Sequence, residues 1–392
     1  MRLLDAALLP YAIPLRRAYR SARGRHTDRR GYLFRLEGPD RIVGIGEAAP
    51  LDDRTETLDG ARAALEAVVR WVRSGAHGAE ELLARLPPPG GSRDRDRAAQ
   101  PPGPLPELHG APAARAAVAT ALFDLLSRRE ELPLHRWLAD RWTGGRRPPA
   151  WVPVNAVLPG APPERLARAA AEAVRRGFRC LKLKVGLDDG TDVAGARAVR
   201  AAVGAGVGIR LDANGAWSFE QARERLRELE PLHIEYVEQP LPAAEYGAMA
   251  RLRAISPIAV AADEAVRDPF SARRLVEAGA ADVLVLKPAV LGGPDVALEI
   301  AHDVEVAGIA AVVTSALDGV TGRLAALHTV AALGPRPRAS GLATGTLLSH
   351  EVARGEERLE RGRLLVPDAP GLGAYWPEEP GAPPTATRTI GP

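Results

Sequence analysis

Lysine is rare in this chain, and its few positions are where the sequence points most directly to chemistry. Of 52 basic residues only Lys182, Lys184 and Lys287 are lysine, and the others are arginine. Guanidinium stays charged in proteins, whereas a lysine amine loses its proton when its surroundings disfavour the ammonium form. Lys182 and Lys184 are two apart, so on a strand both side chains point to one face, where two ammonium groups repel. The pair is therefore a candidate base for proton abstraction.

Three acidic residues follow the lysine pair at nearly equal intervals. Asp212, Glu238 and Asp263 come 28, 26 and 25 residues after one another, counted from Lys184, and Lys287 follows 24 residues later. Three carboxylates, with water or substrate completing an octahedron, suit a hard divalent cation such as Mg²⁺. The alternative for any one acid is that it caps the following helix or pairs with an arginine.

Lys287 would then face the lysine pair across a metal-bound substrate. Amines on two sides of a substrate suit removal of a proton from carbon, or stabilisation of the anion that results. The alternative for Lys287 is a buried ion pair with an acid, for instance Glu264.

The elements that would position these side chains are short β-like runs separated by Ala/Arg/Glu/Leu-rich helical segments from Trp151 onward. This alternation is typical of repeated βα units, and a spacing of about 25–30 residues favours a (β/α)8-type barrel with its site at the carboxyl ends of the strands. A doubly wound open sheet is the second choice, because it would not naturally give eight even units. The eight runs are 152–157, 180–185, 207–213, 234–240, 258–264, 283–289, 310–316 and 340–345.

The first 145 residues have a different pattern, which predicts an α+β region. Residues 30–47 read as a β-hairpin turning at Gly38-Pro39-Asp40. Residues 57–74 and 113–129 read as helices. Residues 86–112 are rich in Pro, Gly and Arg and are expected to form a flexible surface insertion.

The composition excludes several classes of protein. Basic and acidic residues are interspersed (52 against 49) and aromatic residues make up 4%, so we expect no nucleic-acid partner. The single Cys180 excludes an intrachain disulfide framework and a cysteine-based zinc site. No apolar run approaches the ~20 residues of a membrane span, and no cleavable leader stands out. We expect a cytoplasmic protein that acts on a small molecule, and a homo-oligomer is left open.

Five motifs on successive strands resemble the enolase superfamily, in particular its muconate-lactonising subgroup. The motifs are KLKV (182–185), RLDANG (210–215), YVEQPL (236–241), ADEA (262–265) and VLKPA (285–289). The resemblance covers nearly the whole chain, since residues 114–138 and 44–51 are similar to parts of that family's capping domain.

The resemblance implies an α/β fold, a TIM-type (β/α)7β barrel with an α+β N-terminal capping domain completed by the C-terminal tail. The implied boundaries are 1–145 for the cap, 146–345 for the barrel and 346–392 for a segment returning to the cap. Cap loops at about 19–29 and 51–57 would set specificity.

The resemblance also implies roles for individual residues, in a mechanism that belongs to the superfamily as a whole. Asp212, Glu238 and Asp263 would bind Mg²⁺, which Mn²⁺ could replace. Lys184 would abstract the proton α to a carboxylate of the substrate, Lys182 would assist it, and Lys287 would stabilise the enediolate or act from the opposite face. Asn214 and Glu264 would support the metal ligands, and substrate contacts would come from Asn155, Ser315, Ala316, Leu317 and Thr344.

Within the subgroup, TSALDG (314–319) and GLATG (341–345) look like o-succinylbenzoate synthases of menaquinone biosynthesis. This implies a carbon–oxygen lyase that removes water from a succinyl-hydroxycyclohexadiene carboxylate. Dipeptide epimerases of the subgroup usually carry Asp-x-Asp after strand eight, where this chain has Leu342-Ala343-Thr344. An N-succinylamino acid racemase, a dipeptide epimerase or a cycloisomerase remains the alternative. More remote alternatives are a metal-independent Schiff-base aldolase and a non-catalytic binding barrel.

Overall fold

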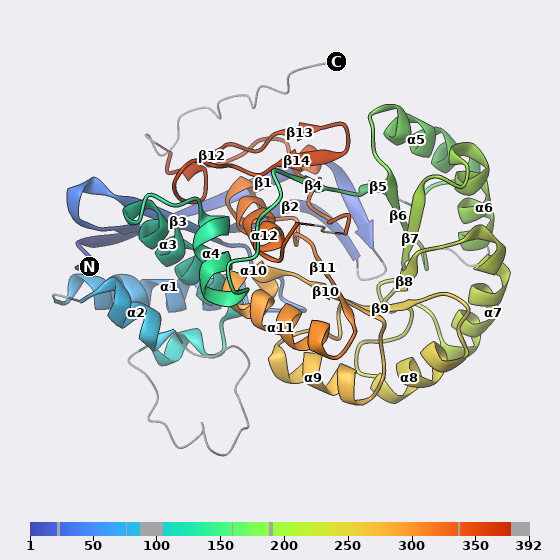
Figure 1. Ribbon diagram of the computed structural model, residues 1–392, viewed down its shortest axis with the longest axis horizontal. Coiled ribbons are helices and arrows are strands. Elements are labelled where there is room, and N and C mark those ends of the chain that lie inside the picture. Colours follow the sequence, from blue (N-terminus) through green and yellow to red (C-terminus); the bar gives the residue numbers. More distant parts are fainter. Residues whose placement is uncertain are drawn as a thin grey trace.

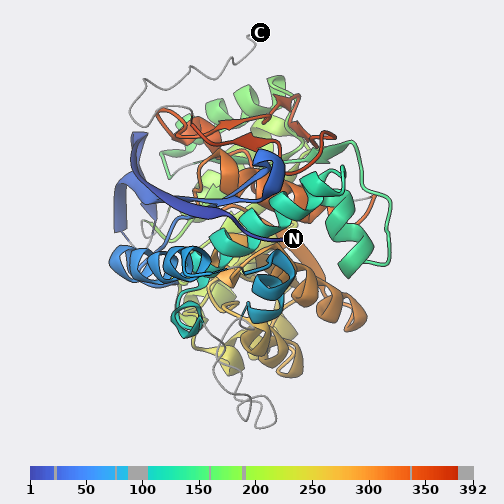
Figure 2. The same cartoon turned by 90° about the vertical axis from the view of Figure 1, so that its left-hand side faces the viewer.

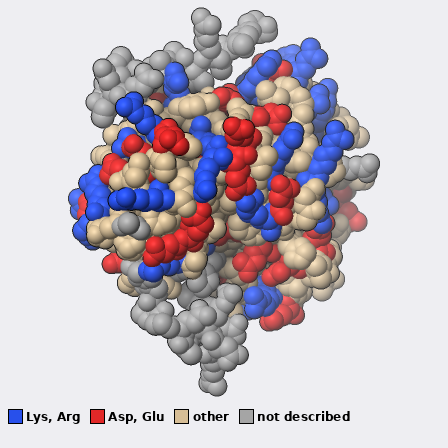
Figure 3. Space-filling view, turned by 60° about the vertical axis from the view of Figure 1, so that its left-hand side comes forward, with Lys and Arg blue, Asp and Glu red and all other residues tan. Residues whose placement is uncertain are grey.

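The computed structural model describes residues 1–21, 24–75, 77–86, 105–158, 160–187, 191–335 and 338–377. The predicted insertion at 86–112 falls largely on residues 87–104, which lie outside the described residues. No described helix is both long enough and apolar enough to cross a membrane. On the face shown in Figure 3, basic and acidic side chains are interspersed.

A β/α barrel forms the larger part of the fold, on the right of Figure 1. Its seven strands are parallel neighbours in the order β11-β10-β9-β8-β7-β6-β5. They are β5 (Ala156–Leu158), β6 (Cys180–Lys184), β7 (Gly208–Asp212), β8 (Tyr236–Glu238), β9 (Val260–Ala262), β10 (Val283–Leu286) and β11 (Ala310–Val313). The helices are α5 (Pro163–Arg175), α6 (Asp192–Val203), α7 (Phe219–Leu229), α8 (Tyr246–Ile255), α9 (Pro269–Glu277), α10 (Pro288–Leu291), α11 (Pro294–Val306) and α12 (Val320–Ala332), with the 3-10 turns η3 (Glu230–Leu232) and η4 (Gly345–Leu347).

The eighth run closes the barrel through two single bridges rather than a full strand. Ser340 pairs in parallel with Val154, and Gly341 pairs in parallel with Thr314 beyond the end of β11. These bridges join the last strand position to the first, so the ring is complete although the ladder there is minimal. The α/β fold with a (β/α)7β barrel is therefore confirmed, and the open doubly wound sheet is excluded.

The N-terminal elements pack against one side of the barrel, on the left of Figure 1 and toward the viewer in Figure 2. They are β1 (Asp5–Ser21), β2 (Gly24–Glu37), η1 (Pro39–Arg41), β3 (Val43–Ala48), α1 (Leu58–Arg73), α2 (Ala79–Arg85), η2 (Pro106–Leu108), α3 (Pro112–Arg129) and α4 (Leu134–Trp142). The predicted hairpin is β2 and β3, and the two predicted helices are α1 and α3. We call this part the cap; its exact limits as a domain stay a prediction.

Strand β1 is one of the cap elements that the sequence did not indicate, as are the helices α2 and α4. It pairs antiparallel with β2 and forms an edge of the three-stranded sheet β1-β2-β3. Pro10 and Pro14 lie within it, and proline inside a run argues against a central strand because it cannot donate a ladder hydrogen bond. An edge strand tolerates proline, and this explains why the pattern was missed.

Glycine allows β3 to lie directly against α3. A Cβ on Gly44 would come within 2.0 Å of the Ala121 carbonyl oxygen, and one on Gly46 within 1.9 Å of the Ala117 carbonyl oxygen. Only residues without a side chain permit this approach. The segment Gly44-Ile45-Gly46 is therefore a packing surface in a strand.

Glu47, at the end of β3, joins the cap to the barrel. Its carboxylate accepts hydrogen bonds from the backbone N–H groups of Gly319 (2.6 Å) and Gly322 (2.9 Å) at the start of α12, and from the Tyr11 hydroxyl (2.5 Å). A carboxylate at a helix N-terminus satisfies N–H groups that have no partner within the helix and interacts favourably with the helix dipole.

The C-terminal segment lies across the junction of cap and barrel (Figure 1). Its strands are β12 (Arg354–Gly355), β13 (Leu359–Glu360), β14 (Arg363–Leu365) and β15 (Ala374–Tyr375), and β14 pairs with β4 (Trp151–Pro153) at the entry to the barrel. The buried Arg323 of α12 bonds to Glu351 (2.7 Å) and Glu357 (2.6 Å) of this segment.

Two buried histidines meet where α4, α12 and the C-terminal segment come together. The rings of His135 and His328 stack with centroids 5.3 Å apart. The His135 backbone N–H donates to His328 Nδ1 (3.0 Å), and His328 Nε2 lies 3.0 Å from the Leu372 carbonyl oxygen. Burial lowers the pKa of His135 to about 4 and that of His328 to about 3, the latter with the help of His135.

This pair predicts a loss of stability in mild acid. Both pKa values are lower in the folded protein than the ordinary value near 6.5, so the unfolded chain binds more protons and the free energy of unfolding falls as the pH drops below about 6.5. We expect a loss of roughly 2 kcal/mol for each of the two histidines between pH 7 and pH 5. Urea unfolding at both pH values measures it.

The controls for this prediction are substitutions of histidine at buried and exposed positions. The double variant His135→Gln/His328→Gln should show a flatter pH dependence than the unchanged protein. His302→Gln, on the exposed side of α11, should not differ from it. An equal loss between pH 7 and pH 5 in all three proteins would contradict the assignment.

Candidate active site

The parallel register of the barrel brings the candidate residues side by side. Lys184 of β6 is the register partner of Asp212 of β7, and Asp212 is the partner of Glu238 of β8. Asp263 follows β9 directly and Lys287 follows β10 directly. All five therefore lie at the carboxyl end of the strands, the face on which barrels of this kind carry their active sites.

A cavity of about 900 Å³ opens at this face, between the cap and the barrel. Eleven of the thirteen predicted site residues line it, and Glu238 and Asp263 do not line it but are buried and bonded to residues that do. The predicted residues in the lining are Asn155, Lys182, Lys184, Asp212, Asn214, Glu264, Lys287, Ser315, Ala316, Leu317 and Thr344.

The two lysines of β6 contact the carboxylates directly. Lys182 Nζ lies 2.6 Å from Glu238 Oε1 and 2.8 Å from Asp212 Oδ2. Lys184 Nζ lies 2.5 Å from the same Asp212 oxygen and 2.9 Å from Asn214 Oδ1. Both amines thus approach Asp212, as expected for side chains two apart on a strand.

These contacts correct one expectation from the sequence. Mutual repulsion of the lysine pair was expected to disfavour protonation, and burial acts in that direction. The adjacent Asp212 and Glu238 nevertheless raise the pKa of Lys182 well above its usual value. The cause lies in the carboxylates, because each supplies a charge within 3 Å of the amine. Burial, together with the charge of Asp212, raises the pKa of Glu238 above its usual value.

Lys287 forms the opposite side of the site. Its amine contacts both oxygens of Asp263, at 2.8 and 2.5 Å. The alternative for Lys287, a buried ion pair with an acid, is therefore present in the structure, with Asp263 as the partner. Burial and the positive charge of Arg54 lower the pKa of Lys287.

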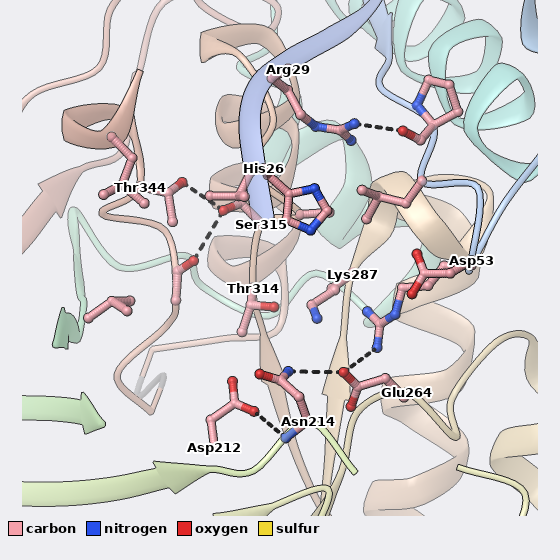
Figure 4. Close-up of a pocket in the computed structure, with 18 of the residues that line it drawn as sticks. His26, Arg29, Asp53, Asp212, Asn214, Glu264, Lys287, Thr314, Ser315 and Thr344 are labelled. Carbon is pink, nitrogen blue, oxygen red and sulfur yellow. Dashed lines mark hydrogen bonds and ion pairs between the residues drawn. The ribbon is translucent and has the colours of Figure 1, made fainter. Parts of the chain in front are cut away.

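The two predicted supporting residues connect to each other. Asn214 Nδ2 donates to Glu264 Oε1 (3.0 Å), as Figure 4 shows. The Asn214 backbone N–H donates to Asp212 Oδ1 (3.1 Å), and φ of Asn214 is 47°, a left-handed conformation that asparagine tolerates. Gln239, which the sequence did not single out although it belongs to YVEQPL, accepts the backbone N–H groups of Asp263 and Ala265, both at 3.1 Å.

The predicted substrate-contacting residues lie where the barrel closes. Ser315 Oγ is 2.8 Å from Thr344 Oγ1, and the two hydroxyls face the cavity from strand positions seven and eight (Figure 4). Asn155 lines the cavity from the first strand position, beside Gly341. These side chains are uncharged, so this part of the wall is polar but neutral.

The wall of the cavity that the cap forms carries charged side chains. The sequence analysis predicted this wall only as two loops, at about 19–29 and 51–57. Arg29 is buried, and its guanidinium donates to the Pro50 carbonyl oxygen (2.6 Å) and to that of Ala49. No motif in the sequence marked the individual residues, because their contacts are made with segments far away in the chain. The lining residues of the cap are His26, Asp28, Arg29, Arg30, Pro50, Leu51, Asp52, Asp53, Arg54 and Leu58.

The three carboxylates can be tested as a metal site. Among the described residues, no group of three or more His, Cys, Asp or Glu side chains converges as a metal shell. The reason is visible in the contacts: the ammonium groups of Lys182 and Lys287 lie against the carboxylates. Glu238 Oε2 is buried without a hydrogen-bond partner, which leaves a ligand atom available. The donor set, three carboxylates on adjacent strands, fits a hard divalent cation.

Comparison with known proteins shows the family to which the chain belongs. Residues 165–379 match the enolase C-terminal domain-like family. The chain is 41% identical to the o-succinylbenzoate synthase of Thermobifida fusca over 204 residues, 51% of this chain and 62% of that enzyme. The chain thus spans less than two thirds of that relative. It is 28% identical to the N-succinyl-L-Arg/Lys racemase of Bacillus cereus over 329 residues, 84% of each chain.

Solved structures extend the match to nearly the whole chain. The dipeptide epimerase of Enterococcus faecalis, crystallised with Mg and the dipeptide L-Leu-L-Tyr, superposes with a TM-score of 0.83 and 27% identity, covering 95% of this chain and 99% of that one. Fold and sequence agree, and the chain belongs to the muconate-lactonising subgroup of the enolase superfamily.

Proposed function

We propose that the protein is an o-succinylbenzoate synthase, a Mg²⁺-dependent carbon–oxygen lyase. It would convert 2-succinyl-6-hydroxy-2,4-cyclohexadiene-1-carboxylate into 2-succinylbenzoate through an enediolate, in menaquinone biosynthesis in the cytoplasm. The observation that carries the proposal is the placement of Lys184 and Lys287 on opposite sides of one cavity, with three carboxylates beside them. The identity to the Thermobifida fusca enzyme supports this choice within the subgroup.

The residues of the chain divide the reaction between them. Lys184 would take the proton α to the substrate carboxylate, and Lys182 would bind that carboxylate. Lys287 would stabilise the negative charge from the other side. The β-hydroxyl would then leave as water by taking the proton that Lys184 had accepted, and this completes an aromatic ring, so one base is sufficient for the dehydration.

Asp212, Glu238 and Asp263 would hold the Mg²⁺. The ion would supply positive charge to stabilise the enediolate. The carboxylates that now raise the pKa of Lys182 would share their charge with the ion, which favours the amine forms of the lysines. Mn²⁺ has the same preference for oxygen ligands and is expected to substitute.

The neutral wall around Ser315 and Thr344 supports a substrate without an ammonium group at that end. No acidic side chain is among the residues that line the cavity from the described part of 340–347. A dipeptide, whose ammonium group needs a carboxylate partner, therefore fits less well there than a succinyl compound.

A second candidate is an N-succinylamino acid racemase, and one observation favours it. Asp28, Asp52 and Asp53 all line the cap wall of the cavity, where they could contact a cationic substrate side chain. The Bacillus cereus relative, an N-succinyl-L-Arg/Lys racemase, aligns over 84% of this chain. Racemisation would use both Lys184 and Lys287 as acid and base.

The deciding experiment is an ultraviolet assay of dehydration with purified full-length protein, the cyclohexadiene substrate and Mg²⁺. We expect turnover at a rate typical of enzymes, on the order of 1–10³ s⁻¹, and loss of turnover after thorough chelation with EDTA. Activity that survives chelation would favour the Schiff-base aldolase chemistry instead. Racemisation of N-succinylarginine without dehydration would favour the second candidate, and no proton exchange with either compound would indicate a binding barrel.

Lys184→Arg tests the assignment of the base. The substitution keeps the positive charge but removes an amine that can lose its proton, so we expect turnover to fall by roughly 10³-fold or more. Circular dichroism would verify that the variant is folded. Turnover within about tenfold of the unchanged protein would exclude Lys184 as the base.

Asp212→Asn tests the assignment of the metal ligands. Removing one of three ligand charges should weaken Mg²⁺ binding at least about tenfold in calorimetry. The matched control is Asp282→Asn, because Asp282 lies at the other end of the barrel strands, bonded to Arg253 (2.7 Å). An unchanged dissociation constant in the Asp212 variant would remove this residue from the ligand set.

A further inference from the structure

Arg54 is the side chain through which the cap contacts the acidic groups of the barrel. It belongs to the loop between β3 and α1, and 9% of its side chain is exposed. Its Nη2 lies 3.0 Å from Asp263 Oδ1 and 3.6 Å from Glu264 Oε1. One guanidinium therefore contacts two neighbouring carboxylates that are more than 200 residues away in the sequence.

The loop that carries Arg54 is itself fixed to the cap. The Glu56 carboxylate accepts the backbone N–H groups of Ala113 (3.1 Å) and Ala114 (2.7 Å) at the start of α3. Thr57 caps the N-terminus of α1 by accepting the Gly60 N–H (3.1 Å). The backbone next to Arg54 is therefore held by the cap, while its guanidinium contacts the barrel.

A first path leads from Arg54 to Lys287. Asp263 Oδ1 accepts both Arg54 Nη2 (3.0 Å) and Lys287 Nζ (2.8 Å). The orientation of this carboxylate is therefore shared between the two cations, and moving one of them changes the position that suits the other.

A second path leads from Arg54 to Lys184. Glu264 Oε1, which faces Arg54, accepts Asn214 Nδ2 at 3.0 Å, and Asn214 Oδ1 accepts Lys184 Nζ at 2.9 Å. Figure 4 shows the bond between Glu264 and Asn214. This path reaches the side of the cavity opposite Lys287.

We propose that Arg54 is a positioning residue that sets the places of Lys184 and Lys287 together. Both chains of contacts begin at Arg54. The position of the loop between β3 and α1 therefore determines where the two amines that face the substrate lie. Lys182 lies one contact further from Arg54, because it meets Lys184 only through the shared Asp212 Oδ2 and is also held by Glu238. The inference rests on the proposed function only for the catalytic meaning of the two amines.

The scarcity of lysine makes a direct test available. Full-length protein labelled with 13Cε-lysine gives three side-chain signals, which individual Lys→Arg variants assign. In Arg54→Gln we expect the signals of Lys184 and Lys287 to shift and that of Lys182 to stay close to its original place. The matched control is Arg62→Gln, an exposed arginine of α1 that pairs with Asp59 on the surface.

The outcomes of the labelling experiment separate the alternatives. Shifts of Lys184 and Lys287 alone support the proposal. Three other patterns overturn it. A shift of Lys287 alone indicates one local contact, and no shift indicates that the residues are not coupled. An equal shift of all three lysines indicates a general loosening of the structure. Arg54→Lys serves if the glutamine variant does not fold; it keeps the charge but lacks the planar fork, so the same two signals should shift less.

Steady-state kinetics of the same variants provide a second, independent measurement. Misplacement of both amines should lower kcat roughly 10- to 100-fold in Arg54→Gln with KM changed by less than about threefold. A rise in KM with unchanged kcat would mean that Arg54 serves substrate binding, and would overturn the positioning role. If the unchanged protein shows no dehydration, the proposed function fails, while the labelling experiment still decides the role of Arg54.

Discussion

Charge compensation inside the mouth of the barrel is the constraint on which the rest of this structure depends. Asp212, Glu238 and Asp263 are almost completely buried, and each is in contact with an ammonium group. Isolated charges at such depth are strongly unfavourable, and removing one partner of a buried pair typically costs about 3–5 kcal/mol. The lysines therefore stabilise the fold and are placed for chemistry by the same contacts. A cation that enters the site has to take over part of their role.

Much of the site could be predicted because residues at regular intervals in the sequence become neighbours in space when they lie on adjacent parallel strands. Residues about one βα unit apart at strand ends, such as Lys184 and Asp212, become lateral neighbours in the register. The repeated 24–28-residue intervals therefore identified the barrel, its orientation and its charged face. The rarity of lysine also helped to locate the site. Because arginine supplies the other positive charges of the chain, the positions of the three lysines are informative.

What could not be predicted depends on contacts between distant segments. Arg54 meets Asp263 across more than 200 residues, and no local pattern distinguishes it from the many other arginines of the chain. Strand β1 was hidden by two prolines that only an edge strand tolerates. The expected effect of the lysine pair on protonation was wrong for Lys182, because the number of carboxylates around one amine is a property of the packing and not of the strand that bears it.

The Glu47 contact has a consequence for how this barrel is specialised. Barrels often bind phosphate near strands seven and eight, at a helix N-terminus. Here the N–H groups of Gly319 and Gly322 are already engaged by a carboxylate of the chain itself. The cap behaves as a permanently bound anionic ligand of α12. This helix N-terminus therefore attaches the second domain, and its two N–H groups are not offered to a substrate anion.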